Sequence, residues 1–590
     1  MRSTLWPILA LFLALHALYN WATPLGEGPD EPGHLAYAIF LAGEGRLPVQ
    51  RADPEASDVP GEGHQPPMAY ALAAPTVAWL PPDERTILLT ANPRFLWAGG
   101  DEPGAFMRFS RELWPWEGLT LAWHMARAVS GLWGALAVAL TFLAARRLSP
   151  GDPWLAPIAA LLVALNPQLL FTTALATNDA LLAALGAACL WWCLRPAPPA
   201  AWALGAGLIF GLALLTKQSA LLLGPLLLWG GRRAAGGDWR RFVGITLGWG
   251  LAALAVAGWW YWRNLALYGD PFGLGAFKAE FATQPFAWGD PAAWAGALGQ
   301  LFASFWARFG WMSLRPPSWA LWPYAGLCAA AALGWALALR RGRPDDGWAG
   351  PAIAVAMALA WTLAFAAAAG LVAWQGRMLF PAVGAIGLGL AAGLRAVATR
   401  HGRETPRRGI PTVVVAALVV LAAFMPLGAI RPGYTWVALA PREALAGLGS
   451  TTYARFAASW ERGVELRGWR LEGSAAPGAA LPLTLTWHSL EPVPRPWTVF
   501  VHLVAADETI VAQSNRQPRG DTLPFPLWTP GDWVQDTHRL DLPADLPPGE
   551  YRLRVGLFRA DGDGRRQRVW GEDGGELGSY AELGLVSVGR

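Results

Sequence analysis

Long runs of apolar residues, separated by short polar connectors, fill most of the first 430 positions of the chain. Three runs are short and follow one another closely, at Ala180–Leu194, Trp202–Leu215 and Ser219–Trp229. Eight others are long enough to cross about 30 Å of hydrocarbon as helices, namely Leu5–Trp21, Leu119–Ala145, Trp154–Ala174, Phe242–Trp262, Trp319–Leu339, Pro351–Trp374, Met378–Ala396 and Ile410–Ile430. The pattern predicts a polytopic α-helical membrane protein with about eleven transmembrane helices.

Arginines at the ends of these runs predict their orientation, because cytoplasmic loops are rich in Lys and Arg. The first run has no small-residue cleavage site before Pro24, so we expect it to be retained as a helix with Arg2 in the cytoplasm. The arginines of five later connectors then fall on the same side, provided that Lys217 marks a break between two short helices. One helix over 202–229 would instead place Lys217 inside the membrane, which is unfavourable.

This orientation places the long loop 22–118, the loop 263–317, the turns 176–179 and 375–377 and the C-terminal segment outside the cytoplasm. The cytoplasmic connectors are short and contain no glycine-rich phosphate-binding loop. We therefore expect any chemistry to be extracytoplasmic, at a multi-pass cell membrane protein, and to use a donor already carried across the bilayer.

The C-terminal part follows a different pattern. Short alternating stretches, separated by turns rich in Pro and Gly, occur at Leu481–Trp487, Thr498–Val504, His538–Leu542 and Tyr551–Leu557. They predict an extracytoplasmic all-β sandwich over residues 455–590, joined by a linker at 436–454 to a membrane domain at 1–435. We expect the histidines in its strands to be ordinary sheet residues rather than metal ligands, at His488, His502 and His538.

Composition agrees with a membrane protein. Hydrophobic residues make up 54% and charged residues 15% of the chain, against about 25% charged residues in ordinary soluble proteins. The formal net charge of +4 is modest and lies between apolar runs, which argues against a nucleic-acid partner. The three cysteines all lie in apolar runs, so neither a disulfide framework nor a zinc site is implied.

The strongest chemical signal follows the first run directly, in Pro29-Asp-Glu-Pro-Gly-His34. In a structural interpretation, Asp30 caps a helix over Leu35–Ala42, and the two acids match the helix dipole. In a functional interpretation, a carboxylate at the outer membrane face acts as general base toward an acceptor hydroxyl. Glu31 and His34 are then placed to bind sugar or to tune Asp30.

Two further outer segments carry polar candidates for a substrate site. Gly63-His-Gln-Pro-Pro-Met-Ala-Tyr70 leads into the apolar run Met68–Val77, which is too short to span and suits an interfacial helix. His64, Gln65 and Tyr70 are its candidates. In the outer turn, Asn178 and Asp179 either contact sugar or acceptor or simply cap the next helix, and the residues favour neither reading.

Seven motifs, in this order, together resemble the GT-C membrane glycosyltransferases. They are Asp30-Glu31, His64-Gln-Pro-Pro67, Asn166-Pro-Gln168 with Thr177-Asn-Asp179, Leu215-Thr-Lys-Gln218, Trp259-Trp-Tyr-Trp-Arg-Asn264 with Tyr268-Gly-Asp270, Ser304-Phe-Trp306 with Phe309-Gly-Trp311, and Gln375-Gly-Arg377. They are most similar to the phospholipid-carrier-dependent enzymes related to protein O-mannosyltransferases and aminoarabinose transferases. The resemblance covers roughly the first 430 residues.

The resemblance implies an inverting transfer of one sugar from a polyprenyl-phosphate donor, with an acidic residue of the first external loop as the base. Asp30 occupies that position, and the neighbouring Glu31 remains an alternative. The β domain is not general to the family, so the acceptor is a glycan, a lipid or a protein. A divalent cation could join Asp30, Glu31, Asp179 and the phosphate, but the spacing requires none, and we assign no metal site.

Cations near the outer ends of the runs fit this chemistry. Charge grows on the leaving phosphate in the transition state, and arginine forks or a lysine ammonium stabilise it. The candidates are Lys217, Arg263, Arg308 and Arg377. For each arginine, contact with lipid headgroups is an equal alternative.

Two other classes of function fit the sequence less well. A lipid or polysaccharide transporter would use the β domain for docking, but the chain shows no clear internal repeat. A membrane-anchored carbohydrate-binding protein would need far fewer than eleven helices. We therefore predict a glycosyltransferase whose partners are the donor lipid, the bilayer and the acceptor.

Overall fold

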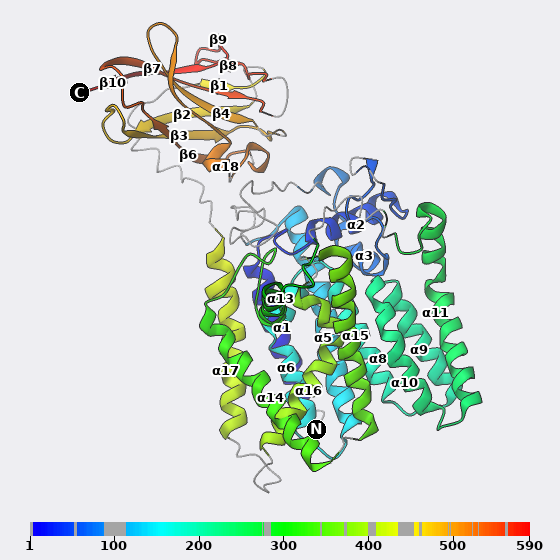
Figure 1. Ribbon diagram of the computed structural model, residues 1–590. Coiled ribbons are helices and arrows are strands. Elements are labelled where there is room, and N and C mark those ends of the chain that lie inside the picture. Colours follow the sequence, from blue (N-terminus) through cyan, green and yellow to red (C-terminus); the bar gives the residue numbers. More distant parts are fainter. Residues whose placement is uncertain are drawn as a thin grey trace. The chain divides into compact units, whose positions relative to one another are not determined.

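The computed structural model describes residues 4–51, 53, 56–85, 87, 114–273, 275, 285–342, 345–370, 374–398, 409–434, 454–458, 463–493, 495, 497–521, 523–528, 530–560 and 564–589. The chain forms two units, one of helices and one of strands (Figure 1). The described part of the predicted linker 436–454 is Ala454 alone, which already belongs to the first strand.

The helical unit contains seven segments that are long and apolar enough to cross a membrane, within the described residues. They are α1 (Leu5–Ala22), α5 (Gly118–Leu148), α11 (Trp239–Tyr268), η6 with α14 (Ser318–Leu321 and Trp322–Arg341), η7 with α15 (Asp346–Trp348 and Ala349–Ala369), η9 with α16 (Gly376–Ala382 and Val383–Ala398), and α17 with η10 and η11 (Gly409–Met425, Pro426–Ile430 and Arg431–Gly433). An eighth is the pair α6 (Leu155–Ala164) and α7 (Pro167–Thr173), bent by 61°. The predicted polytopic helical fold is confirmed, and the number of eleven spans stays a prediction.

The three short apolar runs form separate helices. They are α8 (Asp179–Cys193), α9 (Pro199–Leu214), and η5 with α10 (Gln218–Leu223 and Gly224–Ala234). The predicted break at Lys217 is confirmed, because this residue has an extended backbone between α9 and η5. The Leu215 carbonyl at the break accepts a hydrogen bond of 2.9 Å from the Met68 amide, which ties the break to the long loop.

The long loop contributes α2 (Glu31–Glu44), α3 (Met68–Ala73), α4 (Pro75–Ala78) and η3 (Pro82–Arg85), and α13 (Pro291–Trp306) follows α11. In Figure 1, α2 and α3 lie at one end of the helix bundle. The expected helix after the double proline is present as the two short helices α3 and α4, and its place at the membrane interface stays a prediction. Asp30 precedes α2, but its side chain makes no capping hydrogen bond.

Arginines gather at the opposite end of the bundle. Arg146 and Arg147 lie in the last turn of α5, and Arg233 lies in the last turn of α10. Gly347, just before α15, lies beside both the end of α5 and the Arg233 side chain. At 1.5 Å per residue, Arg127 and Arg147 stand about 30 Å apart along α5, the thickness of a bilayer core.

The β unit consists of two antiparallel sheets, ordered β6-β3-β2-β1-β8-β9 and β10-β7-β4-β5. Side chains of both sheets, such as Trp487 from β3 and Val501 from β4, form one buried core. The predicted all-β domain is confirmed. Its strands are β1 (Ala454–Phe456), β2 (Val464–Leu471), β3 (Ala480–Ser489), β4 (Thr498–Val504), β5 (Ile510–Arg516), β6 (Trp533–Asp541), β7 (Gly549–Phe558), β8 (Val569–Trp570), β9 (Glu576–Gly578) and β10 (Ala581–Val588).

Candidate active site

Glu31 is fully buried and both of its carboxylate oxygens are occupied. Arg127 donates to them from Nε at 2.7 Å and from Nη2 at 2.8 Å. The indole of Trp123 donates at 2.9 Å, and the amides of Gly26 and Ala176 donate at 3.2 and 3.0 Å. This carboxylate therefore fastens the start of α2 to α5 and to the turn before α8.

Arg127 completes the same anchor. Besides Glu31, its guanidinium donates to the carbonyls of Asn20, Thr23 and Pro24, at 3.2, 2.7 and 2.9 Å. These carbonyls lie at the C-terminal end of α1, where the backbone has no partners within the helix. The buried charge is thus paired and fully hydrogen-bonded, as a buried charge must be.

Asp30, directly before Glu31, is partly exposed, whereas Glu31 is fully buried. The Asp30 backbone adopts the left-handed conformation with a φ of 64°, which costs a residue other than glycine about 1–3 kcal/mol. Its side chain is 39% exposed and accepts a hydrogen bond of 2.8 Å from Nη2 of Arg377. Burial raises the pKa of the Asp30 carboxyl, but the charge and hydrogen bond of Arg377, together with the charges of His34 and Lys217, outweigh this effect, so the pKa lies below its usual value.

The ion pair of Asp30 and Arg377 continues into a row of alternating charges. Nη1 of Arg377 lies 3.6 Å from Asp179, whose other oxygen accepts a hydrogen bond from Nζ of Lys217. Nε of Arg377 donates to Gln375 at 2.7 Å. Two acids and two cations from four distant parts of the sequence thus meet at one place, and the Lys217 side chain is 19% exposed.

Close contacts between backbones position Arg377. A Cβ added at Gly376 would lie 2.2 Å from the amide nitrogen of Phe305, so only glycine fits there. The Gly376 amide donates to Oγ of Ser304 at 2.8 Å, and the Asn166 side chain donates to the Phe305 carbonyl at 3.0 Å. Several of the sequence motifs therefore hold the backbone on which Arg377 stands.

A second group of polar side chains surrounds the Tyr70 hydroxyl. It lies 2.9 Å from Nδ1 of His34, 3.3 Å from Glu62 and 3.1 Å from the Asn178 amide nitrogen. The Asn178 amide also donates to Oε1 of Gln65 at 3.0 Å. Four of the predicted substrate-site residues are thus joined in one network, together with Glu62.

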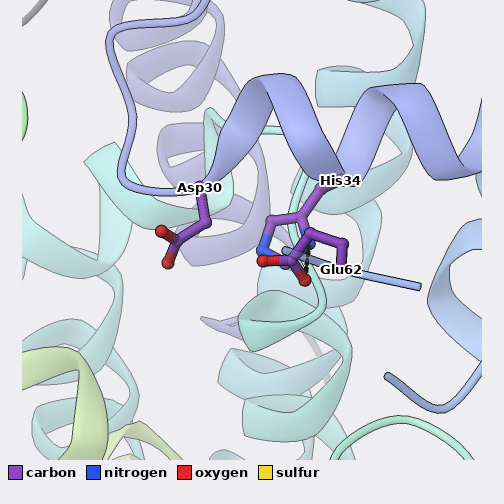
Figure 2. A group of neighbouring side chains, drawn as sticks. All are labelled: Asp30, His34 and Glu62. Carbon is purple, nitrogen blue, oxygen red and sulfur yellow. Dashed lines mark ion pairs between the residues drawn. The ribbon is translucent and has the colours of Figure 1, made fainter. Parts of the chain in front are cut away.

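Asp30, His34 and Glu62 lie side by side where these two groups meet. Figure 2 shows Asp30 and His34 at the start of α2, with Glu62 against the His34 ring. Nδ1 of His34 lies 3.1 Å from Oε2 of Glu62. One ligand atom from each of the three residues lies within 4.8 Å of the others.

An apolar pocket opens on the other side of His34 and Tyr70. Its enclosed volume is about 10 Å³, room for about one water molecule. Besides these two residues, its lining includes Ala126, Ser130 and Trp133 of α5. The pocket therefore joins a polar edge to an apolar wall.

Three predicted residues make their contacts elsewhere. Nδ1 of His64 lies 3.3 Å from Gln50, and Nη2 of Arg263 donates to the Pro48 carbonyl at 2.7 Å. Nε of Arg308 donates to the Met312 carbonyl at 2.6 Å. These described contacts attach the outer loops and do not include the row of charges at Asp30.

Glu62 was not among the site residues predicted from the sequence. It stands two positions before His64, in Gly61-Glu-Gly-His64, and its side chain is 10% exposed. An acid between two glycines beside a candidate histidine was the available signal. Its burial, which sets it apart from an ordinary loop acid, became visible only in the fold.

Part of the helical unit matches a known protein family. Residues 122–262 match the sequence model of a protein family described as dolichyl-phosphate-mannose-protein mannosyltransferase. The resemblance to the GT-C membrane glycosyltransferases is confirmed for this stretch. It runs from α5 to α11 and contains both Asp179 and Lys217.

Two solved structures of one protein align with the chain. ArnT from Cupriavidus metallidurans bound to undecaprenyl phosphate aligns with a TM-score of 0.38 and 15% identity, covering 72% of this chain and 73% of that chain. Its apo state gives a TM-score of 0.33 and 18% identity, over 72% and 78% of the two chains. Among curated proteins, none matches this sequence significantly.

Proposed function

We propose that this protein is an inverting glycosyltransferase that moves a hexose or pentose from a polyprenyl-phosphate donor to an extracytoplasmic glycan, lipid or protein. The observation that carries the proposal is the row formed by Asp30, Arg377, Asp179 and Lys217. It combines a partly exposed carboxylate with two cations at one end of an apolar helix bundle. The family match over residues 122–262 supports the same class of reaction.

In the proposed reaction, Arg377 and Lys217 bind the donor phosphate, and Asp30 is the general base. The acceptor oxygen forms a bond to the anomeric carbon while the bond from that carbon to the phosphate oxygen breaks. The phosphate leaves with the bonding electron pair, and Asp30 takes the proton of the acceptor hydroxyl. Attack opposite the leaving phosphate inverts the anomeric centre.

The contacts of Arg377 suggest how donor binding prepares the base. A phosphate that accepts hydrogen bonds from Arg377 competes with Asp30 for the same guanidinium. Losing this partner raises the proton affinity of the Asp30 carboxylate, because a nearby positive charge favours the ionised form. Asp30 therefore becomes a better base once the donor is bound.

Glu31 is the less suitable base. Both of its oxygens already accept hydrogen bonds, and its side chain is fully buried. We assign Glu31 a positioning role and keep the catalytic role for Asp30. His34, Gln65, Tyr70 and Asn178 are placed to bind sugar or acceptor beside it, and we assign Asp179 to the orientation of the two cations.

Among the four cations expected at the donor phosphate, the geometry favours Lys217 and Arg377. Arg263 and Arg308 donate to backbone carbonyls of outer segments, so their described contacts hold loops. The arginine-rich opposite end of the bundle suits the cytoplasm, which makes the proposed site extracytoplasmic.

The deciding experiment measures transfer from a polyprenyl-phosphate sugar by the purified protein. Asp30→Asn should lose at least about 10²-fold of the transfer rate, the usual scale of general-base catalysis, while donor binding persists. Asp58→Asn is the matched control, because this acid of the same loop pairs with Arg46, away from the site. Near-normal transfer by folded Asp30→Asn protein would exclude Asp30, and movement of intact donor lipid without sugar transfer would indicate a transporter.

A further inference from the structure

Two arginines at the arginine-rich end of the helix bundle converge on one tryptophan. Arg147 lies in the last turn of α5, and Arg195 follows the end of α8, which packs against α5. Their Cζ atoms lie 5.9 and 5.7 Å from the centre of the Trp191 ring, and Cζ of Arg195 also lies 5.0 Å from the centre of the Trp192 ring. These distances are within the range of cation–π attraction. The Trp191 indole therefore holds two positive side chains at one place.

Neither of the two cations is neutralised by an acid within the described part of the chain. Both arginines are exposed. By contrast, Arg241 and Arg395 at the same end of the bundle pair with Asp238 and Asp152. Two like charges that lie close together repel one another, and an anion that contacts both removes this repulsion. The usual excess of arginines in cytoplasmic connectors explains how many there are, but it does not bring two of them to one indole.

An exposed apolar stripe along α5 leads to Arg147. It consists of Leu132, Leu136 and Leu143, which are 58%, 41% and 37% exposed. The spacings of four and seven residues put these leucines on the same side of the helix as Arg147. From Leu132 to Leu143 the helix rises about 16 Å, roughly one leaflet of a hydrocarbon core about 30 Å thick. An apolar stripe of this length with cations at its end fits an amphiphile better than a soluble anion.

We propose that Arg147, Arg195 and Trp191 bind the phosphate headgroup of an anionic phospholipid from the leaflet at this end of the bundle. Guanidinium groups donate paired hydrogen bonds to phosphate oxygens, and an indole suits the headgroup level of a bilayer. Basic sites beside membrane helices recognise anionic headgroups in this way. A zwitterionic lipid adds a cation to the same phosphate, which the two arginines disfavour. The site shares no residue with the proposed donor site.

Lipid binding can be counted on the intact protein. The delipidated full-length chain in a neutral detergent is titrated with phosphatidylglycerol and, in parallel, with phosphatidylcholine, and native mass spectrometry counts the lipids bound per chain. We expect the first phosphatidylglycerol to bind at least about tenfold more tightly than phosphatidylcholine. The double variant Arg147→Gln/Arg195→Gln should bind phosphatidylglycerol about 25-fold more weakly, because each basic residue near an anionic headgroup contributes about fivefold.

Two further variants separate this site from the general positive charge of the same end. Arg340→Gln/Arg341→Gln removes an equal charge from the last turn of α14 and should bind the first phosphatidylglycerol as the wild type does. Trp191→Leu keeps both arginines but removes the ring that holds them, so it should weaken binding without a change of charge.

Four results would each overturn the proposal. They are equal affinities for the two lipids, equal losses in the two double variants, unchanged binding by Trp191→Leu, and displacement of phosphatidylglycerol by millimolar glycerol 3-phosphate. The last result would indicate a site for free anions in place of a lipid. Sugar transfer enters none of these measurements, so the proposed reaction is tested separately.

Discussion

Arg377 and Asp30, 347 positions apart in the sequence, form an ion pair with 2.8 Å between Nη2 and Oδ2. The same guanidinium approaches Asp179, and Asp179 holds Lys217. A cation that is shared between two acids can be redirected by a third anion. This relationship connects the proposed binding of a lipid phosphate with the proposed release of the base.

Removing either cation should weaken donor binding as well as turnover, because the phosphate is charged in both the ground state and the transition state. For Arg377→Ala and Lys217→Ala we expect a loss of donor affinity of about 10- to 150-fold, the equivalent of one charged hydrogen bond of about 1.5–3 kcal/mol. Equilibrium binding of a labelled donor measures it. Arg308→Ala, which changes a cation bonded to the Met312 carbonyl, is the control. Donor binding that is unchanged in both site variants would contradict the assignment.

Amide substitution of the adjacent acids Glu31 and Asp30 should change the stability of the protein to different extents. Glu31→Gln leaves Arg127 buried without its charged partner, and breaking a buried ion pair in this way costs about 3–5 kcal/mol. A markedly lower Tm in thermal unfolding is the expected result. Asp30→Asn should unfold close to the wild-type temperature, since its carboxylate is partly exposed. Equal losses of Tm in the two variants would contradict the division of roles.

Gly376→Ala tests the backbone that carries Arg377. The added methyl group would lie 2.2 Å from the Phe305 amide nitrogen, so the backbone must shift and move the guanidinium. Transfer should fall by at least about tenfold, given that displacements near 1 Å cost about 10²-fold in rate. Gly389→Ala in the same helical segment meets no atom within 4 Å and serves as the control. Full activity of Gly376→Ala would show that this contact does not position the site.

The β unit should lose stability on mild acidification through His502 of β4. Burial lowers the pKa of His502, and the nearby charge of Arg566 lowers it further. Above the unfolded pKa of about 6.5 the histidine is neutral in both states and its contribution is complete. As the pH falls below that value, the unfolded state takes up the proton first, so the contribution is lost.

The measurement for His502 is the Tm of the β unit's transition between about pH 8 and pH 5.5, the range in which a histidine of the unfolded chain titrates. The decrease in Tm should be smaller in His502→Asn than in the wild type. A difference of the opposite sign, with the variant more sensitive to acid, would refute the assigned direction.

The break at Lys217 predicts which segments face the cytoplasm. A cysteine introduced at the exposed Asp238 should react only with membrane-permeant reagents, whereas cysteines at the exposed Arg51, Asp290 and Asp507 should also react with impermeant ones. Positions 51, 290 and 507 lie in the outer loops and the β unit of the expected topology. Labelling of position 238 from outside would reverse the assigned side of every later loop.

The sequence by itself determined the architecture, because the length and period of apolar runs depend on local chemistry. Membrane helices must satisfy their backbone groups internally, so the apolar runs and the break at Lys217 could be predicted directly. The strands after residue 454 could be predicted from their alternation of apolar and polar residues. Asp30 could be named as a candidate general base because it is an acid that follows the first apolar run.

Only the tertiary structure decided which partners each polar residue contacts. Asp30 and Glu31 are neighbours of the same chemistry, and nothing local separates them. The helix rotation that buries Glu31 against Arg127 leaves Asp30 partly exposed beside Arg377. Glu62 gains its place at His34 only when the loop folds over α2. Such pairings depend on which helices pack together, and contacts as close as Gly376 against Phe305 set that packing across long separations in sequence.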